Sequence, residues 1–121
     1  MSIAGTLNTF VGVSAGSSNT TGQNNAFFGT NTGDSNTTGS SNSFFGYKAG
    51  QATTTQSQNS FFGVNAGRNN TVDGNSFFGV NAGFNNTTGA SNAFFGLNAG
   101  QANTTGGLNS FYGDSSNKKS A

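Results

Sequence analysis

Pairs of aromatic residues recur along the chain, and each pair is followed by glycine and a run of polar positions. The stretch Asn-Ser-Phe-Phe-Gly-Val-Asn-Ala-Gly occupies residues 59–67 and again 75–83. Measured from the asparagine before each pair, the repeats follow one another at steps of 17, 17, 17, 16, 17 and 17 residues. A short constant period indicates a repeat architecture in which each unit is one structural element. The single deletion falls in the region 71–74.

Four kinds of position define the repeat. The marker column holds Asn8, Asn25, Asn42, Asn59, Asn75, Asn92 and Asn109. The first aromatic column holds Phe10, Phe27, Phe44, Phe61, Phe77, Phe94 and Phe111. The second holds Val11, Phe28, Phe45, Phe62, Phe78, Phe95 and Tyr112. The glycine column holds Gly12, Gly29, Gly46, Gly63, Gly79, Gly96 and Gly113.

This repeat predicts an all-β chain, a parallel β-solenoid of about seven coils. Seventeen residues are too few for a helix pair, and glycine and threonine disfavour helix. We expect two short strands per coil, joined by turns in which glycine supplies unusual backbone angles and asparagine bonds the like residue above it. The expected organisation is a lead-in at 1–7, one solenoid domain at 8–113, and a polar tail at 114–121 that leaves the repeat.

Successive side chains on a strand point to opposite faces, so the two rings of a pair cannot both enter one core. We expect the second ring to point inward together with Val64 and Ala66 in the coil from Asn59, and the first ring to point outward. In either orientation one aromatic column leaves the coil. A continuous apolar stripe is rarely exposed on a soluble monomer. This predicts parallel self-association with the outward column at the shared axis. A homotrimer is the natural closed assembly when each coil contributes one apolar edge, and a dimer is the alternative.

Composition excludes several functions. The net charge of +1 and the 6% of charged residues give no electrostatic footprint for nucleic acid. No apolar stretch is long enough for membrane insertion, and residues 1–10 do not read as a secretory signal. His and Cys are absent, and Asp34, Asp73 and Asp114 occupy different repeat positions, so we expect no enzyme activity, no metal and no cofactor.

Threonines recur once per coil and suggest an alternative function. Thr21, Thr38, Thr55, Thr88 and Thr105 belong to a regular hydroxyl ladder that resembles the ice-binding face of some antifreeze proteins. Threonine also favours strands and bonds along a stack, which is the simpler explanation. A further alternative is end-to-end polymerisation through unpaired terminal coils. The threonines complete glycosylation sequons at Asn19, Asn36, Asn69, Asn85, Asn86 and Asn103.

The motif Asn-Ser-Phe-Phe-Gly-Val-Asn-Ala-Gly with Asn-Thr-Thr-Gly resembles the repeats of bacterial and phage tail fiber domain-containing proteins. More distantly it is similar to the head of trimeric autotransporter adhesins, a left-handed parallel β-roll. The resemblance covers Leu7 to Gly113. It implies a non-enzymatic shaft or head of a homotrimeric fibre, extracellular, on a cell surface or on a virion, with a receptor or glycan as a possible partner. The paired phenylalanines and the longer unit depart from the adhesin pattern.

Overall fold

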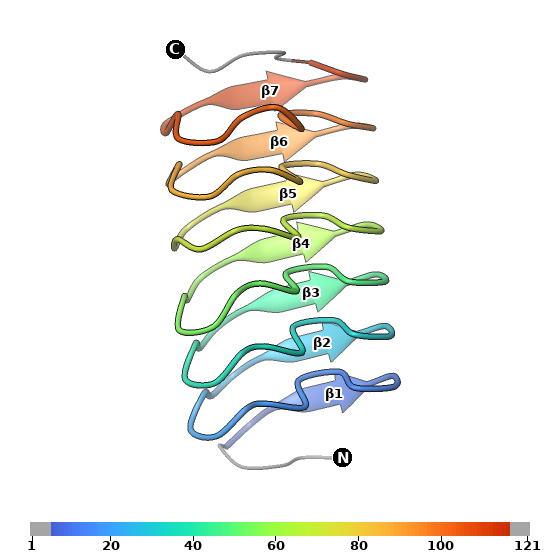
Figure 1. Cartoon of the computed structure of the whole chain (residues 1–121), viewed down its shortest axis with the longest axis vertical. Coiled ribbons are helices and arrows are strands. Elements are labelled where there is room, and N and C mark those ends of the chain that lie inside the picture. The colour runs from blue at the N-terminus through green and yellow to red at the C-terminus, as the bar shows by residue number, and fades with distance from the viewer. Residues whose placement is uncertain (1–5, 117–121) are drawn as a thin grey trace.

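The structure, a computed structural model, describes residues 6–116 and contains strands but no helix in that range. Seven parallel strands form one sheet in chain order (Figure 1). The strands are β1 (Thr9–Val11), β2 (Ala26–Phe28), β3 (Ser43–Phe45), β4 (Ser60–Phe62), β5 (Ser76–Phe78), β6 (Ala93–Phe95) and β7 (Ser110–Tyr112). Each strand is followed by a return loop that leads up to the next strand. The predicted parallel β-solenoid is confirmed.

Each coil places every repeat position directly over the same position of the coil below. Phe44 pairs with Phe61, and Phe61 with Phe77, although the second step is one residue shorter. The turn absorbs the missing residue: Gly74 takes a φ of 75°, and the Asp73 carboxylate accepts a 2.8 Å hydrogen bond from the backbone N–H of Ser57. The deletion therefore leaves the strand register intact.

Only one strand forms in each coil, so the expectation of two was wrong. The second half of the coil from Asn59 contains Asn65 and Gly67 with φ of 59° and 60°, values of the left-handed region. A backbone that enters this region repeatedly turns instead of extending. Inter-coil bonds nevertheless continue there, for example from the Gly67 N–H to the Ala82 carbonyl at 2.9 Å.

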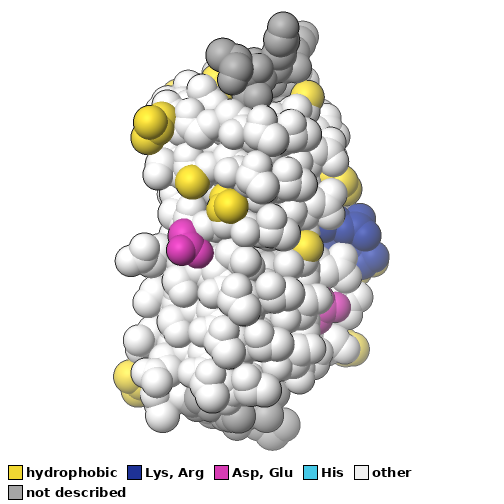
Figure 2. Space-filling model, turned by 60° about the vertical axis from the view of Figure 1, so that its left-hand side comes forward, with side chains coloured by type: hydrophobic (Ala, Val, Ile, Leu, Met, Phe, Trp, Pro, Cys, Tyr) yellow, Lys and Arg dark blue, Asp and Glu magenta, His cyan; other side chains and the backbone are white. Residues whose placement is uncertain are grey.

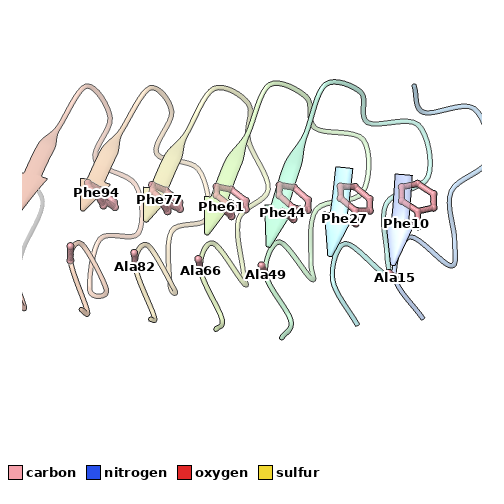
Figure 3. Packing of buried hydrophobic residues seen from close by; sticks show 11 residues of the cluster. Phe10, Ala15, Phe27, Phe44, Ala49, Phe61, Ala66, Phe77, Ala82 and Phe94 are labelled. Carbon is pink, nitrogen blue, oxygen red and sulfur yellow. The ribbon is translucent and has the colours of Figure 1, made fainter. Parts of the chain in front are cut away.

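The first aromatic of each pair fills the interior, which corrects the expected orientation. Phe61 and Ala66 are fully buried, whereas Val64 is 41% exposed. The rings form one internal stack facing the alanines (Figure 3), with centroids 4.7–5.0 Å apart from Phe10 through Phe111. The physical reason is the corner at Gly63, where a φ of 139° ends the strand after Phe62. Val64 therefore lies outside, and the interior holds one ring per coil.

The marker asparagines form a buried ladder of hydrogen bonds. The side-chain oxygen of Asn42 accepts a 3.0 Å bond from the backbone N–H of Asn59, and its amide donates 2.8 Å to the Gln56 carbonyl. The backbone-to-side-chain bond recurs at every step from Asn8 to Asn109. Each amide thus satisfies two backbone groups that a tight corner would otherwise leave without partners. The predicted asparagine ladder is confirmed.

A second buried ladder joins Asn19 to Asn36 and Asn70 to Asn86 and Asn103, but Thr53 interrupts it. Regular steps have amide-to-oxygen distances of 2.7–2.8 Å. The threonine hydroxyl is turned to the Asn70 carbonyl, 3.4 Å away, and the buried oxygen of Asn36 has no hydrogen-bond partner. A buried unsatisfied acceptor costs about 1 to 3 kcal/mol.

We expect Thr53→Asn to stabilise the chain by about 1 to 2 kcal/mol, because the new amide bonds Asn36 and its oxygen accepts from Asn70. The midpoint of thermal unfolding, followed by circular dichroism, is expected to rise by roughly 3 to 8 °C. Thr54→Asn, at the exposed neighbouring position, is the matched control. An unchanged midpoint for the Thr53 variant would contradict a gap in the ladder.

Candidate functional site

The second aromatic column forms a ridge along the outside of the sheet. We call Phe28, Phe45, Phe62, Phe78 and Phe95 the outer ridge. Their rings are partly exposed and stack with centroids 4.6–4.8 Å apart and planes within 9°. Val11 and Tyr112, at the two ends of the column, are 52% and 69% exposed. The expectation that one aromatic column leaves the coil is confirmed for this column.

Small residues lie beside the ridge on the same side of the sheet. In each strand the residue before the buried ring points outward like the residue after it, and the central strands show this alternation of burial. We call this column of small residues the valley; it contains Thr9, Ala26, Ser43, Ser60, Ser76, Ala93 and Ser110. The sheet therefore presents two outer columns, one of large rings and one of small side chains.

A third exposed column follows the ridge around the corner. It contains Val13, Tyr47, Val64, Val80 and Leu97, which are 41–73% exposed. Each lies two residues beyond the second aromatic position of its coil, within about 7 Å along the chain. We call the ridge, the valley and this third column the outer face. From β3 to β6 its three columns contain no charged residue; Lys48, next to Tyr47, has its Nζ 5.0 Å from that ring's centroid.

The threonine columns behave differently from each other. Hydroxyls of the first column bond along the stack, as from Thr20 to the Thr37 carbonyl at 3.1 Å and from Thr87 to the Thr104 carbonyl at 3.1 Å. The second column, Thr21, Thr38, Thr55, Thr88 and Thr105, is exposed, and Val72 replaces threonine in one coil.

The space-filling view in Figure 2 shows a mainly uncharged polar surface with scattered hydrophobic side chains.

Most of the sequons are not available in the folded chain. Asn19, Asn36, Asn86 and Asn103 are buried and belong to the second ladder. A glycan on Asn36, Asn86 or Asn103 would have to displace an inter-coil hydrogen bond that the side-chain amide donates. Asn85 is exposed and Asn69 partly buried. The sequence predicted glycosylation sequons at these asparagines but not the buried ladder. Their recurrence at the repeat period was the signal that they stack from coil to coil.

Charged residues are few, and two of them, Asp34 and Arg68, are linked through Gln51. The Gln51 amide bonds Asp34 at 3.4 Å, and the Arg68 Nε donates to the Gln51 oxygen at 3.1 Å. The Arg68 guanidinium also lies 5.5 Å from the centroid of the Phe84 ring. Within residues 6–116, no group of three or more His, Cys, Asp or Glu side chains is placed to hold a metal ion.

Comparison with protein-family models, with curated proteins and with solved structures gave no match to this chain. In the described range of the chain, no helix has the length and apolar character needed to cross a membrane. The site is therefore defined by its own geometry, and its most distinctive feature is the outer face.

Proposed function

We propose that the chain is a non-enzymatic structural module of an extracellular fibre, on a cell surface or a virion, which associates with copies of itself through the outer face. The observation that carries this proposal is the outer ridge, whose partly exposed rings follow one another from β2 to β6. Soluble monomers rarely expose contiguous apolar patches of this kind. Repetition in every coil suits an extended contact between rods better than a pocket for one small ligand.

The polar ladders support the structural role. Backbone groups and asparagine side chains are bonded from coil to coil, and these hydrogen bonds hold successive coils in register. A rigid surface that repeats at one strand spacing is a suitable shaft or head for a fibre. The resemblance to tail-fibre repeats points the same way. It also suggests a cell-surface receptor or glycan as a further partner. Nucleic acid is not proposed as a partner, because the chain has too little positive charge to bind phosphates.

Phe62→Ser, Phe78→Ser and Phe95→Ser together are expected to dissociate the assembly, because the contact loses three apolar anchors per chain. Each buried phenylalanine contributes about 1.5 to 3 kcal/mol, so the dissociation constant is expected to rise at least ~100-fold. Sedimentation velocity over a concentration series gives the mass relative to the 12.2 kDa chain. Thr38→Ser, Thr88→Ser and Thr105→Ser is the matched control.

Several outcomes would contradict this proposal. Association that survives the three substitutions in a correctly folded chain would place the contact elsewhere. A parent chain that stays monomeric and shows thermal hysteresis would favour ice binding, for which the exposed second threonine column is the available surface. Concentration-dependent filaments that persist in the ridge variant would favour end-to-end growth.

A further inference from the structure

The outer side of the sheet has an asymmetric relief. Along each strand a small residue comes first and a large ring comes second, separated by the buried phenylalanine; in β4 these are Ser60 and Phe62. Two residues along a strand span about 6.6 Å. The seven parallel strands repeat this order in register. The sheet thus carries a ridge and a parallel valley, each running the length of the rod.

From this relief we infer the identity and orientation of the partner: a second copy, related by a twofold axis parallel to the rod. The inference rests on the proposed self-association and specifies its geometry. Rotation about such an axis keeps the two rods parallel and reverses the strand direction across the contact. The ridge of each copy then faces the valley of the other, so that Phe62 of one copy lies over Ser60 of its partner.

The opposite orientation lacks this fit. Rotation about an axis parallel to the strands makes the rods antiparallel but leaves the strand direction unchanged across the contact. Ridge then faces ridge and valley faces valley, which holds the sheets apart and leaves a gap over Ser60 and Ser76. Only the parallel pair resembles a dry interface between facing sheets, in which large side chains interdigitate with small ones.

Repeat spacing, charge and area are compatible with this pairing. Both rods repeat at about 4.8 Å, so a ring that fits the valley in one coil fits in every coil. The outer columns of β3 to β6 contain no charge, so parallel pairing brings no like charges together there. Seven coils at ~4.8 Å, by five residues at ~3.3 Å, give ~550 Å² per copy. The pair therefore buries ~1,100 Å², which is above the ~1,000 Å² minimum for a biological interface and just below the standard size class.

Filling the valley tests the fit. Ser60→Leu with Ser76→Leu is expected to raise the dissociation constant at least ~10-fold, because leucine occupies the space that the partner's rings need. In an antiparallel pair the same leucines would fill the gap between the facing valleys, so the dissociation constant would stay unchanged or fall. Thr38→Leu with Thr88→Leu, on the exposed threonine column, is the matched control and is expected to leave the constant unchanged. Thermal unfolding of each variant at low concentration checks that the chain remains folded.

Spin labels measure the orientation. The chain has no cysteine, so single cysteines at Thr21, Thr55 and Thr105 can each be labelled alone. In a parallel pair the distance between the two labels is expected to be the same at all three heights. In an antiparallel pair centred on the rod, labels at Thr21 are offset along the axis by about five coil spacings, ~24 Å, and labels at Thr55 by much less.

The results separate the two proposals. A mass twice that of the chain, equal label distances and weakening by the leucines support the parallel twofold pair. A mass three times that of the chain, or label distances that depend on height, would overturn this inference and leave self-association through the outer face standing. A parent chain that is monomeric at all concentrations would overturn both, as would association that does not depend on the outer ridge.

Discussion

Phe61→Ala is expected to lower the free energy of unfolding by about 3 to 5 kcal/mol. Phe61 has no exposed surface, and its ring lies between those of Phe44 and Phe77, with centroids 4.8 and 5.0 Å away. Parallel strand register holds both neighbours at their own heights, so they cannot move far into the space. A cavity in an interior one ring wide therefore stays largely open. Urea denaturation followed by circular dichroism measures the loss.

The neighbouring Phe62→Ala is the matched control, because it removes the same atoms from the other side of the same strand. Phe62 is partly exposed, so its loss is expected to destabilise the isolated chain by only about 1 kcal/mol. Both variants should be compared at concentrations where the chain is monomeric. Equal losses from the two would show that the interior does not distinguish the two rings, and would contradict the assignment of the first column to the core.

Gly67→Ala has the second largest expected effect, a loss of about 2 to 5 kcal/mol in the free energy of unfolding. The backbone of Gly67 has a φ of 60°, where a side chain costs about 1 to 2 kcal/mol. An added Cβ would also lie 2.5 Å from the Phe61 ring, and overpacking of this kind costs about 1 to 3 kcal/mol more. The ring cannot retreat, because it is stacked on both sides.

Gly74→Ala separates these two costs. Gly74 has a φ of 75°, but the nearest atom to an added Cβ is the Ser91 hydroxyl oxygen, 4.0 Å away. For this variant the free energy of unfolding is expected to fall only by the cost of the left-handed backbone angle, about 1 to 2 kcal/mol. The difference between the two alanines, measured by urea denaturation, isolates contact with the aromatic stack. If the two variants are equally stable, Gly67 is required for its backbone angle alone.

The period and the columns predicted the general architecture. A unit of 17 residues with paired aromatics, turn glycines and a constant asparagine indicated a parallel solenoid, and the stacked Phe and Asn columns are present. The deletion was correctly placed in the turn region, where Gly74 takes the left-handed angle that Gln58 and Ser91 take in neighbouring coils. The repeat register also continues past the predicted end of the domain, since the Ser116 carbonyl accepts from Gly100. The rest of the polar tail and most of the lead-in lie outside the described residues.

Local alternation could not decide which ring points inward. The pattern Phe-Phe-Gly-Val-Asn-Ala-Gly is compatible with either face as long as the strand is assumed to continue through glycine. The choice depends on Gly63 and Asn65, whose positive φ values end the strand and move Val64 outside. Gly67 then lies under the ring of Phe61, where no side chain fits. These are properties of the closed coil, and the order of residues alone does not contain them.

An exposed aromatic column was predicted correctly as the candidate site, but the residues assigned to it were each one position too early in the sequence. An exposed aromatic column was expected at Phe61, Phe77 and Phe94, but it consists of Phe62, Phe78 and Phe95. Serine substitutions at the first set would therefore unfold the coil instead of releasing a partner. The valley was not predicted. Its small residues form a groove only because they lie beside the outer ridge, and the side of the sheet that carries the ridge was not known from the sequence. Oligomeric state and receptor stay predictions.

The shortened turn at 71–74 has a consequence for engineering. Loss of one residue there leaves β4 and β5 paired residue by residue, so the length of this corner is independent of the sheet. A corner that tolerates deletion is also a suitable place for insertion. Foreign peptides grafted at the same corner of successive coils would be displayed in a straight line at fixed intervals, while the ridge on the sheet remains free for assembly.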